Sequence, residues 1–189
     1  MFRNFAKQVR INLILTSLLI IAPATLMAVS PGDVIATSIT LIADLDASGY
    51  NGSALRVGAD NIIIDGGGKT ITVNGNNAGF ELNGHSFVTI KNAVVVSNTS
   101  GQGRGIYLNN SSDSQFENNT LSGLLNAIYV SGTNSRNTLH NNIMTGSTGN
   151  AFESHGTANN LDWVITDNTV TGGNGLAIYY RGRIGTING

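Results

Sequence analysis

Two short motifs repeat along this chain on one period, and that period constrains the fold more than any other feature. The first motif is a five-residue pattern (GFELN, GIYLN, AIYVS, AFESH, AIYYR) that starts at residues 79, 105, 127, 151 and 177. The second (IKNAVV, FENNTL, LHNNIM, ITDNTV) starts at residues 90, 116, 139 and 165. Because the two motifs advance in step, the sequence predicts an array of stacked structural repeats.

The length of the apolar runs indicates that each repeat is made of short strands. The runs are only a few residues long, alternate in pairs, and are separated by Gly, Asn, Ser and Thr. A helix would instead need apolar residues at a 3.6-residue period over ten or more positions. Leucine-rich repeats share the period, but their leucine framework is absent. The spacing therefore predicts an all-β parallel β-helix, a solenoid of about five coils with 22–26 residues per coil.

Alternation within the first motif assigns its two faces. The second position is always apolar and is predicted to be core: Phe80, Ile106, Ile128, Phe152 and Ile178. The third position holds two carboxylates that would be costly inside, so it is predicted to face water: Glu81, Tyr107, Tyr129, Glu153 and Tyr179.

The second motif carries a column that we interpret as a structural ladder at a bend. Its members are Asn92, Asn118, Asn141 and Asp167. Asparagine tolerates the left-handed backbone conformation of a sharp turn, and stacked Asn side chains can hydrogen-bond from coil to coil. A metal or catalytic role for Asp167 is the alternative.

The N-terminus has the three-part layout of a secretory signal. Arg3, Lys7 and Arg10 precede an apolar run over residues 11–28, which predicts a signal peptide at residues 1–24, with cleavage after Ala28 as the other option. An uncleaved membrane anchor is the alternative. Residues 31–75 are interpreted as an N-terminal cap and a first irregular coil, and residues 76–189 as the repeats. No closing segment is visible before Gly189, which leaves open a longer array truncated at its C-terminus.

Composition excludes some partners. Without residues 1–24, seven basic and eleven acidic residues remain, a net charge of −4, so the chain offers no basic surface for nucleic acid. After signal cleavage no membrane span is expected, and the predicted location is secreted, periplasmic or at the cell surface. The chain has no cysteine, and therefore no disulfide.

The sequence NIIIDGGGKTI at residues 61–71, followed by the repeated motifs, resembles a known group. It is similar to the right-handed parallel β-helix repeat proteins of the pectate-lyase-like superfamily, including exported proteins of the NosD-type periplasmic copper-maturation group. The resemblance covers about residues 38–182 and implies a right-handed solenoid. Because that superfamily includes lyases, hydrolases, epimerases, adhesins and proteins without known activity, it implies no single function.

The enzymatic branches each demand particular residues. The Arg-x-Pro-x-x-Arg element of pectate lyases and the Asp pair of galacturonan hydrolases are absent. One constellation remains as the basis of an alternative function, a uronate polysaccharide lyase or epimerase: Glu153, His155, Tyr179 and Arg181. His155 or Tyr179 would act as base, Arg181 would stabilise the developing charge, and Tyr179 would donate the proton.

Binding is the preferred hypothesis for the same face. We expect Glu81, Tyr107, Tyr129 and Tyr179 to form an aromatic strip about 15–20 Å long that binds extracellular polysaccharide, or to belong to a scaffold without catalysis. The other alternative is an adhesin or envelope structural protein. The expected partner is a polysaccharide or envelope component, and the oligomeric state stays open. We predict no cofactor and no metal site, because neither calcium nor copper has a supporting set of ligands.

Overall fold

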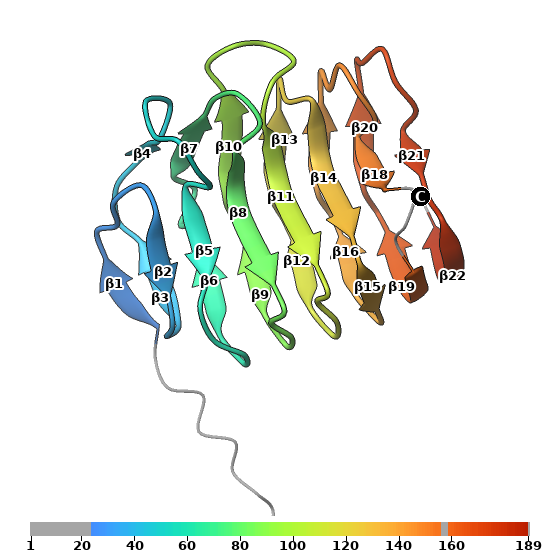
Figure 1. The fold of residues 1–189 in the computed structure, drawn as a ribbon, viewed down its shortest axis with the longest axis horizontal. Helices are drawn as coiled ribbons and strands as arrows, with labels where there is room; N and C mark the ends of the chain where they lie inside the picture. The colour runs from blue at the N-terminus through green and yellow to red at the C-terminus, as the bar shows by residue number, and fades with distance from the viewer. Residues whose placement is uncertain (1–23, 156–158, 189) are drawn as a thin grey trace, which may run out of the picture.

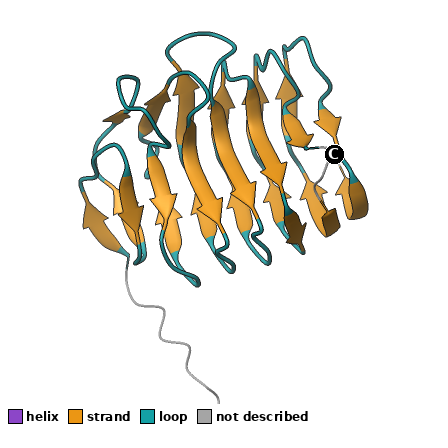
Figure 2. Cartoon of the chain, in the orientation of Figure 1, coloured by secondary structure: helices purple, strands orange, loops and turns teal. Residues whose placement is uncertain are grey.

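The computed structural model describes residues 24–155 and 159–188, which form a stack of short strands joined by turns (Figures 1 and 2). Each strand pairs in parallel with the equivalent strand of the next coil, so the stack is a right-handed parallel β-helix, as predicted. None of the described segments is a helix long and apolar enough to span a membrane. The predicted signal peptide lies, except for its last residue, outside the described residues.

Three parallel sheets form the walls of the solenoid, and we name them A, B and C. Sheet A contains β1 (Thr25–Met27), β3 (Ile39–Leu41), β6 (Ile63–Asp65), β9 (Thr89–Lys91), β12 (Gln115–Glu117), β15 (Thr133–Ser135), β16 (Thr138–His140), β19 (Asn159–Thr166) and β22 (Gly182–Asn188). Sheet B contains β2 (Asp33–Ile35), β5 (Leu55–Val57), β8 (Ala78–Asn83), β11 (Arg104–Asn109), β14 (Asn126–Ser131), β18 (Phe152–Ser154) and β21 (Ile178–Tyr179). Sheet C contains β4 (Leu45–Asp46), β7 (Thr70–Val73), β10 (Val94–Ser97), β13 (Thr120–Ser122), β17 (Ile143–Thr145) and β20 (Thr169–Thr171).

The solenoid has about six coils, where the repeat spacing predicted about five. Within the described residues, six coils place a strand in every sheet, from β2–β3–β4 to β18–β19–β20, and β21 and β22 begin a further one. The difference lies in residues 33–73, which hold two coils. Their sheet B strands, DVI and LRV, lack the five-residue motif by which the later coils are recognised.

The interior is a set of apolar columns that run from coil to coil. The sheet B column confirms the predicted core positions: Phe80, Ile106, Ile128 and Phe152 are fully buried in register with one another. In sheet A the column is Ile39, Ile64, Ile90, Phe116, Leu139, Ile165 and Ile187. A fully buried side chain of this size contributes about 1.5–3 kcal/mol, so these columns hold the coils together in the absence of disulfides.

The bend after sheet A has the backbone conformation that the sequence predicted. Asn92, Asn118, Asn141 and Asp167 all have positive φ, between 51° and 57°. The Asn141 amide donates to Asn118 Oδ1 at 2.7 Å, and the Asn92 amide donates to Asp65 Oδ1 at 3.1 Å. These side chains therefore form bonded pairs at the surface.

A continuous ladder of asparagines lies one residue later in the chain than the predicted one. Asn119 Nδ2 donates to Asn142 Oδ1 at 3.0 Å, and Asn142 Nδ2 donates to Asn168 Oδ1 at 2.9 Å. Asn119 and Asn142 are almost completely buried and also donate to the backbone carbonyls of Ile90 and Phe116. Because buried amides need partners, this ladder fixes the spacing of the coils more firmly than the surface pairs do.

Candidate ligand-binding face

The outward side of sheet B, which we call the sheet B face, carries the residues that the sequence selected for binding. Backbone pairing places Glu81 beside Tyr107, Tyr107 beside Tyr129, Tyr129 beside Glu153 and Glu153 beside Tyr179. All five side chains are half-buried. The predicted order of this column is therefore correct, and it continues through Arg56 and Val34 toward the N-terminus.

The rings on this face form a line, but not the flat strip that the sequence predicted. The centroids of Tyr107 and Tyr129 are 5.8 Å apart with an angle of 47° between the ring planes. The next ring is His155, whose centroid is 5.8 Å from that of Tyr129 with an angle of 48°. Tyr179 does not extend the line directly, because Glu153 stands between it and Tyr129 in the column.

Arg104 completes this group and is not among the residues predicted from the sequence. Its guanidinium carbon lies 4.2 Å from the centroid of the Tyr129 ring and 5.9 Å from that of Tyr107, and Nη1 donates to the Asn76 carbonyl at 2.9 Å. Arginine over a tyrosine ring is a favourable cation–π contact. The sequence feature that could have identified Arg104 is its position directly before the motif GIYLN, at the start of β11.

The hydroxyl of Tyr129 is held in its protonated form. Burial raises its pKa, and the negative charge of Glu153 adds to the effect, while Arg104 opposes it. Tyr129 therefore offers a neutral hydroxyl and an aromatic ring at physiological pH, rather than a base.

The two carboxylates of the face are tied to neighbouring coils. Glu81 accepts a hydrogen bond from the Ser53 hydroxyl at 2.7 Å. Glu153 accepts from the Asn126 amide at 2.8 Å and from the Asn150 amide at 3.2 Å. These hydrogen bonds orient both carboxylates, whose oxygens can also accept hydrogen bonds from a ligand.

The four residues predicted to be catalytic lie in this region, with Glu153 and Tyr179 paired in register, but Arg181 and His155 contact different tyrosines. Arg181 donates to the Tyr179 hydroxyl from Nε at 3.0 Å and from Nη2 at 2.7 Å, whereas His155 contacts Tyr129. The pairing between β18 and β21 ends at Glu153 and Tyr179, so His155 and Arg181 lie beyond it. The lyase or epimerase hypothesis stays a prediction.

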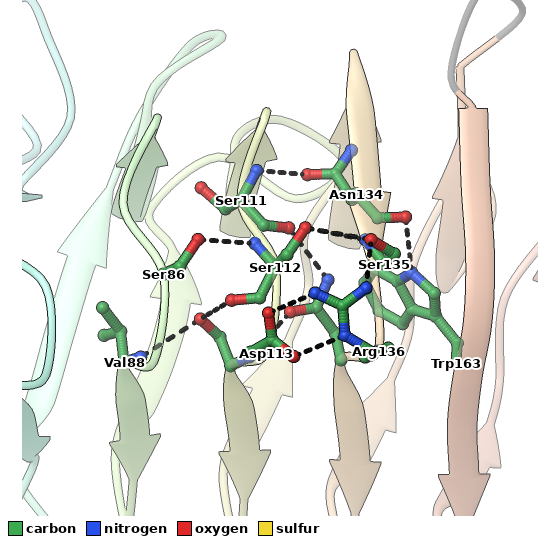
Figure 3. Close-up of polar contacts among 11 residues, drawn as sticks. Ser86, Val88, Ser111, Ser112, Asp113, Asn134, Ser135, Arg136 and Trp163 are labelled. Atoms are coloured by element: carbon green, nitrogen blue, oxygen red, sulfur yellow. Dashed lines mark hydrogen bonds and ion pairs between the residues drawn. The ribbon is translucent and has the colours of Figure 1, made fainter.

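A second polar region lines the turn between sheets B and A, and its contacts are structural (Figure 3). Asp113 and Arg136 form a two-pronged ion pair across adjacent coils, with Nε to Oδ1 at 2.7 Å and Nη2 to Oδ2 at 2.6 Å. Asn134 Oδ1 accepts from the Ser111 amide, and its carbonyl accepts from the Trp163 indole at 3.4 Å. Trp163 is fully buried and packs edge-on against Phe152 in the core.

The fold and the face together define a class, a right-handed β-helix repeat protein with one aromatic outer wall. The family model of NosD, the periplasmic copper-binding protein, matches residues 36–186. The chain therefore belongs to the NosD family and is exported, either secreted or periplasmic. Neither the curated proteins nor the solved structures compared with the chain include a match.

The copper in the family's description does not fit the residues described here. Copper sites draw on several thiolate, thioether or imidazole ligands, and no group of three His, Cys, Asp or Glu side chains in residues 24–155 and 159–188 could hold a metal ion. His85 pairs with Asp60 at 3.0 Å, and His140 pairs with Asp167 at 3.3 Å. Neither pair has a third metal-ligating side chain beside it among the described residues. Met144 is buried in the core, 2% exposed.

Proposed function

We propose that this exported β-helix protein binds an extracellular or periplasmic polysaccharide on the sheet B face, with Tyr107, Tyr129 and His155 as the contact line. The spacing of these three rings carries most of the support. They stand on successive coils with centroids 5.8 Å apart, so the line runs along the solenoid axis and suits a long polymer better than a compact ligand.

The chemistry around the rings fits a sugar polymer. Ring edges and faces contact the apolar C–H surfaces of sugars, and polar groups beside them bind hydroxyls. Ser131 and Asn109 supply such groups next to the rings, with the Ser131 hydroxyl 3.0 Å from that of Tyr107. Arg104 lies over Tyr129 and stiffens the line, which lowers the entropy lost on binding.

Native affinity electrophoresis through gels that contain pectate, alginate or a neutral glucan tests this proposal. We expect the wild-type chain to be retarded in at least one gel. Tyr129→Ala should weaken that retardation by about tenfold in apparent affinity, the scale of one lost aromatic contact. Tyr50→Ala is the matched control, because Tyr50 is an exposed tyrosine that follows β4 in the first coil and is not part of the contact line.

Two outcomes would count against polysaccharide binding. Equal mobility of the folded wild-type chain in every gel would favour the adhesin or envelope-structural hypothesis. Retardation that Tyr129→Ala and Tyr50→Ala reduce equally would place the binding surface elsewhere. Circular dichroism of each variant confirms that the fold is retained.

A further inference from the structure

The outer side of sheet C, which we call the sheet C face, differs from the other two walls of the solenoid because its outward side chains carry no charge from β7 to β20. They are threonine, valine, isoleucine and serine: Thr70, Thr72, Val94, Val96, Thr120, Ser122, Ile143, Thr145, Thr169 and Thr171. Each of them is half-buried or exposed. In contrast, the outer side of sheet A carries Lys91 and Glu117 in register, and the sheet B face carries Glu81 and Glu153. The sheet C face therefore lacks the charges by which a charged polymer or peptide is recognised.

The outward side chains of sheet C form two columns with a constant repeat. The first column is Thr70, Val94, Thr120, Ile143 and Thr169. The second lies two residues further along each strand and is Thr72, Val96, Ser122, Thr145 and Thr171. The strands follow one another along the stack, and no register shift interrupts these pairings (Figure 1). In a parallel sheet, neighbours within a column are about 4.8 Å apart and the two columns about 6.6 Å apart, so the face is a regular two-dimensional array.

The residue types make this array rigid and able to order water. Threonine, valine and isoleucine are β-branched, so their side chains are restricted about χ1. The Thr145 hydroxyl donates to that of Ser122 at 2.9 Å, whereas the hydroxyls of Thr70 and Thr120 have no hydrogen-bond partner among the described residues. Methyl groups restrict the orientation of the water beside them, and hydroxyls without a protein partner can bond to that water. A rigid surface that repeats both groups therefore holds its first layer of water at a fixed spacing.

We propose that the sheet C face binds ice. Its two repeats, about 4.8 Å along the stack and about 6.6 Å along the strands, are close to those of the oxygen atoms on a prism face of hexagonal ice. Water held by the array can thus join the crystal lattice, and an uncharged crystal surface needs no charge on the protein. The chain is exported, so this face meets water outside the cytoplasm. The hydroxyls of the array disfavour a second copy of the chain as the occupant, because two such faces pressed together would bury hydroxyls without partners.

Thermal hysteresis, the gap between the melting and freezing temperatures of a single ice crystal, tests this proposal with the full chain purified after export. We expect the wild type to shape the crystal and to give a hysteresis that rises with protein concentration. Thr120→Lys, in the middle of the first column, should lose most of that hysteresis, because a long and strongly hydrated side chain keeps the crystal away from the array. Ile143→Lys repeats the test at a side chain that is 46% exposed, so the result does not depend on the folding of one variant.

The matched control is the same substitution on another wall. Thr138 is a half-buried, outward threonine of sheet A, and Thr138→Lys should keep the wild-type hysteresis. Thr120→Lys should also be retarded in the polysaccharide gels as the wild type is, so the failure of one proposal leaves the other standing.

Three outcomes would overturn ice binding. The first is a wild type that neither shapes ice nor gives hysteresis. The second is an equal loss of hysteresis in Thr138→Lys and Thr120→Lys, which would place the ice-binding surface elsewhere. The third is a wild-type dimer in sedimentation velocity that Thr120→Lys separates, without any activity on ice, because a second copy would then occupy the sheet C face.

Discussion

The first and last coils use the same type of residue in the same columns, yet they bury it to very different degrees. In sheet A, Ile39 opens the core column and is 1% exposed, whereas Ile187 ends it and is 48% exposed. Above the first coil, β1 pairs with β3, and Val29 packs on the core. No comparable segment covers the last coil within the described residues. Burial in a solenoid therefore depends on the neighbouring coil as much as on the residue itself.

The largest expected effect comes from the same truncation made at the two ends. Ile39→Ala should lower the free energy of unfolding by about 2–5 kcal/mol, because it leaves a cavity in a closed part of the core. Ile187→Ala should cost less than about 1 kcal/mol, because much of its side chain already contacts solvent. Urea unfolding of both variants, followed by circular dichroism, measures the difference.

Equal losses for the two isoleucine variants would break the comparison between the ends. They would mean that the last coil is covered in solution, either by another copy or by a segment outside the described residues. Repeating the measurement at low protein concentration separates these two cases, since only association depends on concentration.

The asparagine ladder gives the next largest effect. Asn142→Ala should lower the free energy of unfolding by about 1–3 kcal/mol, since the buried Phe116 carbonyl loses this donor and the backbone N–H of Asn119 loses its acceptor. Asn168→Ala, one coil closer to the open end, should cost less because Asn168 is only half-buried. Urea unfolding checks both. A larger loss for Asn168→Ala would contradict the view that the ladder weakens toward the open end.

Much of the fold was predictable because a coil is specified by local pattern. The apolar second position of the first motif identified Phe80, Ile106, Ile128 and Phe152 as core, and the period placed Tyr107 beside Tyr129. The left-handed turns at Asn92, Asn118, Asn141 and Asp167 also followed from residue type. Each of these features is set by the type of one residue and by its recurrence at the same position of every coil.

What could not be predicted depends on side-chain direction. In the pair Asn141–Asn142 the motif fixes the turn but not which amide enters the core, so the buried ladder was placed one residue early. Arg104 precedes the motif, and only the structure reveals that it folds back over Tyr129. His155, not Tyr179, extends the line of rings for the same reason. The repeat pattern also does not show that the last coil is less buried than the others, because its residues follow the same motif.

Alkaline pH provides a smaller test of the same contrast, through a tyrosine near the open end. Tyr180 packs against Phe152 and Trp163, and burial raises its pKa well above the ordinary value. A folded-state pKa above that of the unfolded chain means that the stabilisation is complete below about pH 10 and is lost as the pH rises further. The urea midpoint should therefore fall as the pH rises above about 10, which a comparison of pH 9 with pH 11 measures.

Two tyrosine variants assign that loss to one end of the molecule. Tyr180→Phe should reduce the alkaline decrease in the urea midpoint, because phenylalanine has no proton to release. Tyr50→Phe, at the exposed tyrosine of the first coil, should leave the decrease as it is in the wild type. If Tyr50→Phe had the larger effect, the alkaline sensitivity would belong to the closed end.

The smallest expected effect concerns two turn aspartates, one in the middle of the stack and one near the open end. Asp113 forms the two-pronged pair with Arg136, whereas Asp167 lies 3.3 Å from one nitrogen of His140. Asp113→Asn should lower the thermal midpoint by about 1–2 °C and Asp167→Asn by less, since surface ion pairs contribute little. Asparagine keeps the size and tolerates the positive φ of both positions, so the substitution removes the charge and replaces one acceptor oxygen with an NH2 group. Differential scanning calorimetry at low and high salt measures both shifts. A loss for Asp113→Asn that persists in high salt would mean that the lost hydrogen bond rather than the charge causes it, because screening removes only the electrostatic part of the difference.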